Sequence, residues 1–591
     1  MNLTHIEDIY DLSPTQQGML FHSLSAPESG VYVVQLCLTL QGTLNPAALQ
    51  QAWQDVISQH SILRTAFQWE GLEKPLQVVY RQVQVPLNVL DWQKYTSEQQ
   101  AQRLNTFLQR DRQQGFDFAR PPLMRLTLIQ TSIETYSLIW TKHHLILDGW
   151  STGIVLQQVW NHYHQKKYNL YRSLYRSYIA WFQQQDLVAA ETFWRQTLKG
   201  FTAPTRLRIE QQTNNHATVV YLEQSLKLSG TISTELQAIG RQYQLTLNTL
   251  LQGAWAILLS RYSGESDIVF GATVAGRPPD LPGVESLVGL LINTLPVRAT
   301  VSPEMPVITW LQQLQSQQVE ARQYEHTPLI QIQGWSEIPR GMSLFDTLLV
   351  VENYPVEPAL TAGESDSCLA ITNVRAIEQT NYPLTIVAEV GDELVLRLSY
   401  HPEKFEADAI DCLLGHLQTL LTAIVENRDC HIKELPLLTL AEQQQLLIDW
   451  NQTKQAYPEA CLHQVLQQTA DRIPNAIAVR FKDQTLSYQV LHQQANQLAH
   501  LLQKQGVGVG DLVGLCVERS LAMLVSLLGI LKAGAAYVPL DPMYPPERLA
   551  MMVSDSQIQV LVTQQQWLSL FGDALTTVCL DRDAALIAQE S

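Results

Sequence analysis

The chain has 591 residues, of which 46% are hydrophobic, so it is long enough to form several domains with their own cores. Its formal net charge of −17 argues against a nucleic-acid partner, because binding phosphates needs a basic face. The N-terminus lacks the layout of a signal peptide, and the sequence has no uninterrupted apolar run of about 18 residues that could span a bilayer. We therefore expect a cytoplasmic protein that binds neither nucleic acid nor a membrane.

The seven cysteines are scattered along the chain, and no two of them have CxxC spacing. An odd number without paired spacing supports neither a disulfide framework nor a zinc site. We expect buried free thiols and no bound metal.

The first segment alternates predicted helices and strands. Ser13 can cap a helix whose first turn begins at Pro14, and residues 31–40 have a strand period with one strongly apolar face. A helix is expected over 46–60. Arg64 follows among apolar residues, so it is either a member of a structural ion pair or a lining residue of a polar channel.

The stretch 141–151 carries the strongest chemical signal, because it follows an apolar strand pattern and precedes a helical one. The second histidine, His144, can act as a base near neutral pH, and the backbone N–H of Gly149 at a helix start can stabilise an oxyanion. Asp148 could orient His144 or pair with a distant arginine. The alternative is that the histidine is a satisfied core residue. The chain has no Gly-x-Ser-x-Gly elbow and no third carboxylate placed for a metal, so nothing favours a hydrolase or a metalloenzyme.

A second lobe is expected after residue 175. The pattern predicts a helix over 248–262, buried strands over 268–274, 289–298 and 344–351, and a closing helix over 407–425. Arg277 lies at the exit of the first of these strands. Beyond residue 457 helices alternate with short strands, which is typical of an α/β domain.

We therefore predict a mixed α/β (α+β) chain with four parts: 1–175 as the first lobe, 176–433 as the second lobe, 434–457 as a linker, and 458–591 as a further α/β domain.

His143-His144-Leu145-Ile146-Leu147-Asp148-Gly149 resembles the HHxxxDG signature of condensation domains of nonribosomal peptide synthetases. Other stretches fall in the order of that family's motifs, and the resemblance covers roughly residues 8–450. These stretches are 12–24, 59–67 with Gln59 in place of the first arginine, 288–298, 324–329 and 345–355. The family's Tyr-x-Asp-Tyr segment appears as Tyr175-Arg176-Ser177-Tyr178, without the aspartate.

The last part resembles the opening of an adenylation domain, on the segments 486–488 and 531–542. The phosphate-binding loop, the adenylate aspartate and the catalytic lysine of that family would lie beyond Ser591. We therefore expect an incomplete adenylation domain that does not activate an amino acid.

The resemblance implies a chloramphenicol-acetyltransferase-like fold with two lobes in a V. It implies that His144 is catalytic, with His143 as its structural neighbour, and that Asp148 pairs with Arg277 across the lobes. We count His143 and Gly149 with His144 as the catalytic residues. We place Arg64 as a structural residue at the site, and we expect Trp150, Ser151 and Asn293 to contact the substrates. Breaking the Asp148–Arg277 pair should harm folding more than chemistry.

The implied function is peptide-bond formation between a donor thioester on one carrier protein and the amine of an aminoacyl group on another. No cofactor would bind directly, since both substrates arrive on phosphopantetheine arms. The donor carrier is expected on another polypeptide and the acceptor carrier downstream. The pattern over 16–24 resembles the class that accepts D-configured or modified donors. Four alternatives remain: an epimerising domain, a dehydrating domain, a free acyltransferase using coenzyme A, and a recruitment domain without catalysis.

Overall fold

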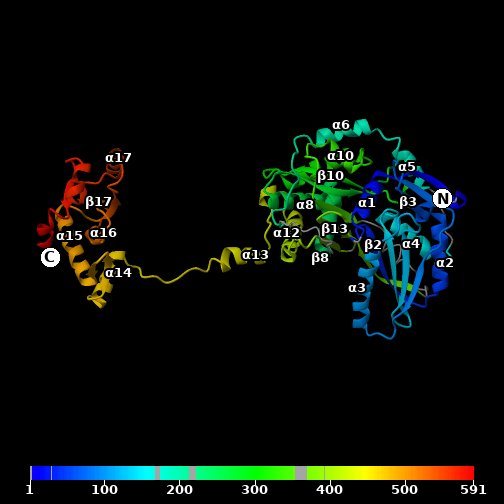
Figure 1. Ribbon diagram of the computed structural model, residues 1–591, viewed down its shortest axis with the longest axis horizontal. Coiled ribbons are helices and arrows are strands. Elements are labelled where there is room, and N and C mark those ends of the chain that lie inside the picture. Colours follow the sequence, from blue (N-terminus) through cyan, green and yellow to red (C-terminus); the bar gives the residue numbers. More distant parts are fainter. Residues whose placement is uncertain (1–2, 28, 167–173, 212–220, 353–368, 392) are drawn as a thin grey trace. The chain divides into compact units, whose positions relative to one another are not determined.

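The computed structural model describes residues 3–27, 29–166, 174–211, 221–352, 369–391 and 393–591 (Figure 1). The chain forms two compact units, Met1–Trp450 and Asn451–Ser591. Cys368 and the last three residues of the 345–355 motif lie outside the described residues. The lobe and linker boundaries expected from the sequence stay predictions.

The N-terminal lobe of the first unit is built on a five-stranded sheet with the order β12-β2-β7-β6-β5 and a smaller sheet with the order β1-β4-β3. Its helices are α1 (Pro14–Ser25), α2 (Pro46–Gln59), α3 (Ser97–Gln114), α4 (Gly149–Tyr163) and α5 (Tyr175–Phe182). Its strands are β1 (Ile6–Asp11), β2 (Val33–Gly42), β3 (Thr65–Gln68), β4 (Leu76–Tyr80), β5 (Leu87–Asp91), β6 (Met124–Gln130), β7 (Thr135–His143) and β12 (Leu369–Ile377).

The C-terminal lobe contains a six-stranded mixed sheet with the order β10-β9-β11-β13-β14-β8. The strands are β8 (Leu222–Lys227), β9 (Asp267–Val274), β10 (Asn293–Thr300), β11 (Thr347–Glu352), β13 (Leu384–Val390) and β14 (Leu394–Tyr400). The helices are α6 (Leu187–Thr197), α7 (Gly230–Tyr243), α8 (Leu247–Ser263), α9 (Val307–Arg322), α10 (Leu329–Trp335), α12 (Ala407–Glu426) and α13 (Leu440–Gln444).

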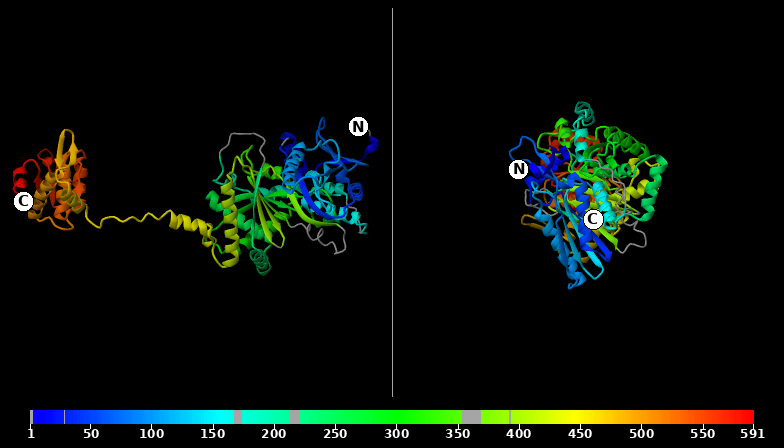
Figure 2. Two further views of the ribbon diagram at one scale, coloured as in Figure 1. Left: turned by 90° about the horizontal axis from the view of Figure 1, so that it is seen from below. Right: turned by 90° about the vertical axis from the view of Figure 1, so that its right-hand side faces the viewer.

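Helices α8 and α12 supply much of the C-terminal core and lie against strands of the six-stranded sheet (Figure 2). Among the described helices, α12 alone is long and apolar enough to cross a membrane by length and composition. Its apolar segment is 56% buried inside the unit. Burial of more than half of this segment is typical of a core helix in a globular lobe.

Two segments that the sequence places in the second lobe pack instead into the N-terminal lobe. Strand β12 pairs antiparallel with β2, from Leu369 opposite Gly42 to Ile377 opposite Gln35. Side chains of the 281–291 segment join the N-terminal core, including Leu287 and Leu291, which are fully buried. Hydrophobic periodicity reports that such residues are buried but not which core they enter, so the sequence does not anticipate either crossing.

Local capping explains where the helices at the lobe interface begin. Ser13 accepts the Gln16 N–H while the Gln16 side chain accepts the Ser13 N–H, which is the predicted start of α1. Asp148 accepts the Ser151 N–H at 2.7 Å and so caps α4. The strand expected over 289–298 begins only at Asn293, because residues 289–292 form loop contacts with the motif described below.

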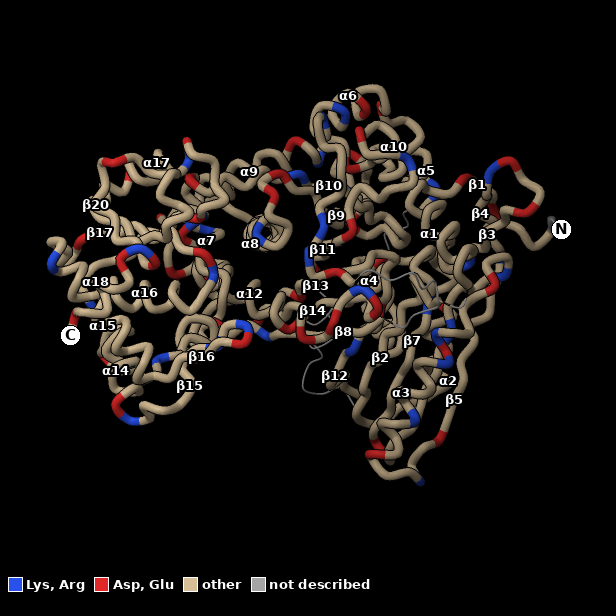
Figure 3. Tube along the Cα trace, turned by 60° about the vertical axis from the view of Figure 1, so that its left-hand side comes forward, with Lys and Arg blue, Asp and Glu red and all other residues tan. Residues whose placement is uncertain are grey.

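The second unit contains a four-stranded parallel sheet, β18-β17-β19-β20, and a hairpin of β15 and β16. Lys and Arg are interspersed with Asp and Glu along both units (Figure 3). The elements are α14 (Leu462–Arg472), β15 (Ile477–Phe481), β16 (Gln484–Ser487), α15 (Tyr488–Lys504), β17 (Leu512–Cys516), α16 (Leu521–Ala533), β18 (Ala536–Pro539), α17 (Pro546–Ser556), β19 (Val560–Thr563), β20 (Thr576–Cys579) and α18 (Ala584–Ala588).

Gly276, in the turn after β9, offers a test of this packing. It has φ +59°, and an added Cβ would lie 1.8 Å from the Leu291 carbonyl oxygen. Gly71 has a similar φ of +70° with open space around it. We expect Gly276→Ala to lower the free energy of unfolding by roughly 2 kcal/mol more than Gly71→Ala, because both carry the backbone strain and only the first carries the clash. Urea unfolding of the two variants checks this, and equal losses would contradict it.

Candidate active site

The 141–151 motif lies where β7 meets α4. Strand β7 ends at His143, a tight turn carries the buried residues Leu145, Ile146 and Leu147, and Asp148 is the N-cap of α4. Gly149 is the first residue of α4, where backbone N–H groups have no partner within the helix. The motif thus presents one imidazole and one helix N-terminus from a rigid strand–helix connection.

A cavity of about 670 Å³ lies between the two lobes, and both His144 and Gly149 line it. The N-terminal lobe also contributes α1 residues, among them Met19 and Phe21, and the C-terminal lobe contributes its β-sheet. The lining residues from that sheet come from β8, β9, β10, β11, β13 and β14, and further ones from the segment after β12. The predicted catalytic histidine therefore faces a space that both lobes enclose.

His144 is held by its backbone and by one side-chain contact. Its N–H donates to the Tyr32 carbonyl at 2.8 Å, and its Nε2 lies 3.1 Å from Oε1 of Glu378. The Nδ1 atom is buried and has no hydrogen-bond partner among the described residues. Nε2 is therefore the nitrogen available for chemistry on the cavity side.

His143 points away from the cavity into the N-terminal core. Its Nδ1 accepts the Leu145 N–H at 3.2 Å, so its Nε2 carries the proton and donates to Ser23 Oγ at 3.2 Å. Phe118 packs edge-on against the imidazole, with ring centroids 4.9 Å apart. Burial, aided by His144, lowers the pKa of His143 to about 3. His143 is thus a neutral structural residue, and its inclusion among the catalytic residues was wrong.

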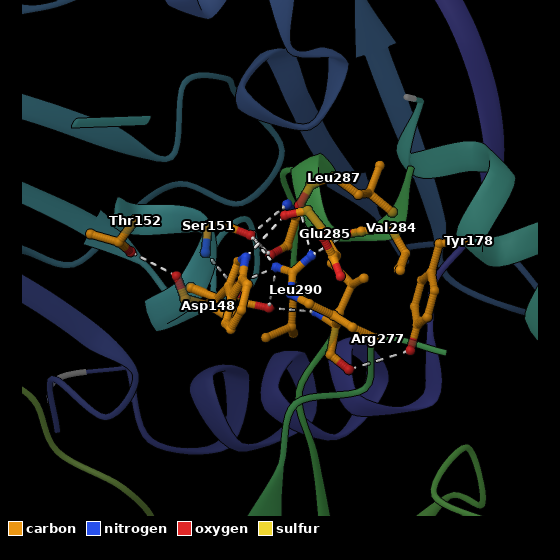
Figure 4. A network of polar contacts seen from close by, with 12 residues as sticks. Asp148, Ser151, Thr152, Tyr178, Arg277, Val284, Glu285, Leu287 and Leu290 are labelled. Carbon is orange, nitrogen blue, oxygen red and sulfur yellow. Dashed lines mark hydrogen bonds and ion pairs between the residues drawn. The ribbon is translucent and has the colours of Figure 1, made fainter. Parts of the chain in front are cut away.

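The ion pair expected between Asp148 and Arg277 is present (Figure 4). The Arg277 Nη2 lies 3.4 Å from Asp148 Oδ1, and the two side chains are 5% and 0% exposed. Arg277 Nη1 donates to the carbonyls of Val284 and Leu287. The Asp148 Oδ2 accepts the Leu291 N–H at 3.0 Å. This pair fastens the 283–291 loop to the first turn of α4.

Ser151 and Trp150 belong to the same network, and the expectation that they contact the substrates stays a prediction. The Ser151 hydroxyl donates to the Gly289 carbonyl at 2.8 Å and accepts from Arg277 and from the Gly289 N–H. Trp150 Nε1 donates to the Glu285 carbonyl at 3.0 Å. Their polar groups are occupied by the loop, and neither residue is among those lining the cavity.

The tyrosines of the altered Tyr-x-Asp-Tyr segment hold the same loop from the other side. Tyr175 donates its hydroxyl to the Leu290 carbonyl at 2.7 Å, and Tyr178 donates to the Leu291 carbonyl at 3.4 Å. Arg176 forms an ion pair with Asp8. The segment therefore anchors the loop without the aspartate of the family pattern.

Arg64 is a structural residue and lies outside the cavity, so its placement at the site was wrong. Its Nη1 forms an ion pair with Glu7 at 2.6 Å and also donates to the Tyr80 carbonyl, while its Nε donates to the Ile57 carbonyl. These acceptors satisfy a guanidinium whose side chain is only 6% exposed. Of the two interpretations left open by the sequence, the structural ion pair applies.

Asn293 lines the cavity at the start of β10, but its side chain is fixed by the protein. Its Nδ2 donates to the carbonyls of Glu325 and Thr327 at 2.8 and 2.7 Å. Its Oδ1 accepts the Thr294 N–H. Asn293 therefore shapes the cavity wall, and its role in binding a substrate stays a prediction.

Two carboxylates that sequence reasoning missed, Glu352 and Glu378, line the cavity near His144. Burial and the charge of Glu378 raise the pKa of Glu352 to about 7. Burial opposes ionisation of Glu378 as well, but His144 and Lys142 outweigh it and hold the pKa of Glu378 below its ordinary value. Burial also lowers the pKa of Lys142 to about 8. Nothing in the local sequence marks either glutamate, because their approach to His144 depends on β11 and on the pairing of β12.

Metal chemistry gains no support from the described part of the chain, where no three His, Cys, Asp or Glu side chains are grouped to hold an ion. The arrangement can instead support acyl transfer. It combines a base facing a cavity, a helix N-terminus beside it and a carboxylate against the base.

Comparison with protein families agrees with this class. Residues 6–447 match the model described as "Condensation domain", and residues 466–590 match the model described as "AMP-binding enzyme". The chain belongs to the condensation domain family, followed by part of an AMP-binding enzyme domain.

Several curated relatives resemble the chain along nearly its whole length. It is 46% identical over 587 residues to one protein of the linear gramicidin synthase of Brevibacillus parabrevis, and 46% identical over 589 residues to a second protein of that synthase. It is 33% identical over 568 residues to bacitracin synthase 3 of Bacillus licheniformis. These alignments cover 98%, 97% and 95% of this chain but only 8%, 12% and 9% of the relatives. The chain thus spans about a tenth of their length.

Solved structures share the fold, which confirms the predicted fold class. A four-domain nonribosomal peptide synthetase bound to AMP and glycine matches with a TM-score of 0.75 and 20% identity, over 98% of this chain and 46% of that one. The X-domain from teicoplanin biosynthesis matches with a TM-score of 0.61 and 23% identity, over 72% of this chain and 97% of that one.

The Asp148–Arg277 pair should be essential to stability. We expect Asp148→Ala to lower the free energy of unfolding by about 3–5 kcal/mol, because it leaves the Arg277 charge buried without its carboxylate. Asp117→Ala, which removes the exposed partner of Arg120, is the control and should cost under about 1 kcal/mol. Urea unfolding followed by tryptophan fluorescence reports mainly on the first unit, since 12 of the 13 tryptophans lie there. An Asp148→Ala protein as stable as the wild type but inactive would contradict the structural role.

His143 should make the first unit sensitive to acid. Its folded pKa of about 3 lies below the ordinary value of 6.5, so between these values the unfolded chain binds a proton that the folded chain does not. The free energy of unfolding should therefore fall as pH falls below 6.5. The contribution of this residue to that loss is up to about 1.4 kcal/mol per pH unit. His143→Gln lacks this titration and should show a shallower loss between pH 7 and 5. The exposed His431→Gln is the control, and parallel curves for wild type and His143→Gln would rule out the effect.

Proposed function

We propose that the first unit catalyses peptide-bond formation between a donor acyl or peptidyl thioester on one carrier protein and the amine of an acceptor aminoacyl thioester on another. The observation that carries this proposal is the position of His144, on the wall of a cavity enclosed by both lobes, beside the N-terminus of α4. Membership of the condensation domain family supports the same reaction.

In the proposed reaction, the acceptor nitrogen attacks the thioester carbonyl carbon, the C–N bond forms and the C–S bond breaks. An α-amine has an ordinary pKa of about 7.7 to 8.0, so a useful fraction is unprotonated at neutral pH. His144 Nε2 positions the amine, takes a proton from the nitrogen and returns it to the leaving thiolate. The Gly149 N–H lies where it can stabilise the carbonyl oxygen as charge develops.

The phosphopantetheine arms belong to the substrates in this proposal. The cavity offers them apolar walls, including Leu344 and Phe345, next to the polar groups around His144. Delivery of the donor by a carrier on another polypeptide and of the acceptor by a downstream carrier are parts of the same proposal.

His144→Ala tests the proposed reaction. We expect the rate of dipeptide formation to fall by about 10² or more, in line with typical general-base contributions. Synthetic aminoacyl groups loaded on separate carrier proteins, with product detected by mass, provide the measurement. His431→Ala, at an exposed histidine outside the cavity, should leave the rate unchanged.

Unchanged turnover in His144→Ala would contradict the role of His144. Loss of configuration in a single aminoacyl carrier, without dipeptide, would indicate an epimerising domain instead. Binding of carriers without either product would indicate recruitment alone.

A further inference from the structure

Glu378 is held beside His144 by the backbone of the N-terminal sheet. Strand β2 lies between β12 and β7, and Gln35 pairs with both Ile377 and Thr141. Just beyond these pairs, the Tyr32 N–H donates to the Gln379 carbonyl at 3.0 Å, and the Tyr32 carbonyl accepts the His144 N–H at 2.8 Å. One residue therefore ties together the chain segments that carry the carboxylate and the imidazole.

The Glu378 carboxylate lies beside Nε2 of His144, on the cavity side from which a nucleophile must approach. Its Oε1 lies 3.1 Å from Nε2, and its side chain is 36% exposed, against 7% for the imidazole. Both residues line the cavity, whereas Nδ1 of His144 is buried. A group that enters the cavity and reaches Nε2 consequently meets the carboxylate as well.

In the part of the chain that the structure describes, Glu378 forms an ion pair with His144, and no lysine or arginine forms an ion pair with it. Among the described residues, three glutamates line the cavity: Glu223, Glu352 and Glu378. Arg397 is the one Lys or Arg among the described lining residues, and its guanidinium forms ion pairs with Glu223, Glu352 and Glu389. Lys142 lies close enough to influence Glu378 but is 2% exposed and donates to Thr152. The described lining thus carries more carboxyl groups than cationic side chains.

We propose that Glu378 is a substrate-binding residue for the acceptor amine, an inference that rests on the proposed function. Its carboxylate accepts one N–H of the amine while Nε2 of His144 faces a second, so that the nitrogen lone pair is directed at the donor carbonyl. When the nitrogen attacks and transfers its proton to Nε2, the carboxylate stabilises the imidazolium, which then protonates the leaving thiolate. A hydroxyl nucleophile has only one hydrogen and, unlike an α-amine, is not in equilibrium with a cation near pH 7, so the pair selects amines.

Equilibrium binding tests the selectivity without requiring turnover. The probes are matched pantetheine amides that cannot transfer their acyl group: alanyl against lactyl, and phenylalanyl against phenyllactyl. We expect the full chain to bind the amine member of a pair about tenfold or more tightly than the hydroxyl member. Glu378→Gln, which keeps the shape but removes the charge, should reduce this ratio to about twofold or less.

Glu389→Gln is the matched control, because it removes a carboxylate that contacts Arg397 but is not among the residues lining the cavity. Glu389→Gln should keep the wild-type ratio of amine to hydroxyl binding. Glu378→Asp, which keeps a carboxylate, should show a ratio between those of Glu378→Gln and the wild type. Thermal unfolding of each variant separates binding effects from misfolding. A ratio that is the same in wild type and Glu378→Gln, with both folded, overturns the proposal.

Turnover provides a second readout. With both carriers loaded, Glu378→Gln should raise the acceptor KM about tenfold and leave the donor KM unchanged. Wild-type protein that forms no dipeptide would defeat the proposed function, while the binding ratio would still decide the role of Glu378. Wild-type turnover with an unchanged acceptor KM in Glu378→Gln would defeat only the present inference.

Discussion

The buried carboxylate of Asp148 is the contact on which the geometry of the site depends. It caps α4, accepts the Leu291 N–H and pairs with Arg277, so one side chain joins the motif, the 283–291 loop and the turn after β9. A charge that is 0% exposed is tolerated because each oxygen has a donor. The position of the Gly149 N–H beside the cavity follows from this cap.

The two adjacent histidines differ because strand geometry turns them to different surroundings. His143 ends β7 and enters an aromatic core, where burial keeps it neutral. His144 lies one residue further, and its Nε2 reaches the cavity and a carboxylate. The same type of side chain therefore serves packing at one position and, in the proposed reaction, proton transfer at the next.

Sequence reasoning predicted the parts of the site that depend on local patterns. The cap at Ser13 follows from residue type, and the pairing of Asp148 with Arg277 was implied by the family resemblance. The hydrogen bonds of Trp150 and Ser151 to the 283–291 loop were not predicted, because proximity in the chain does not reveal which way a helical side chain points. Glu378 was missed because it reaches His144 only through the pairing of β12 with β2, a contact between distant segments.

The crossing of β12 has a consequence for recombination between relatives. The five-stranded sheet takes its edge strand from residues 369–377, far beyond the end of α5. A chimera joined near residue 175 would combine a β2 from one parent with a β12 from another, and an N-terminal fragment alone would expose the β2 edge to unintended pairing. A recombination event that preserves the matched pairing of β2 with β12 must therefore transfer both segments together.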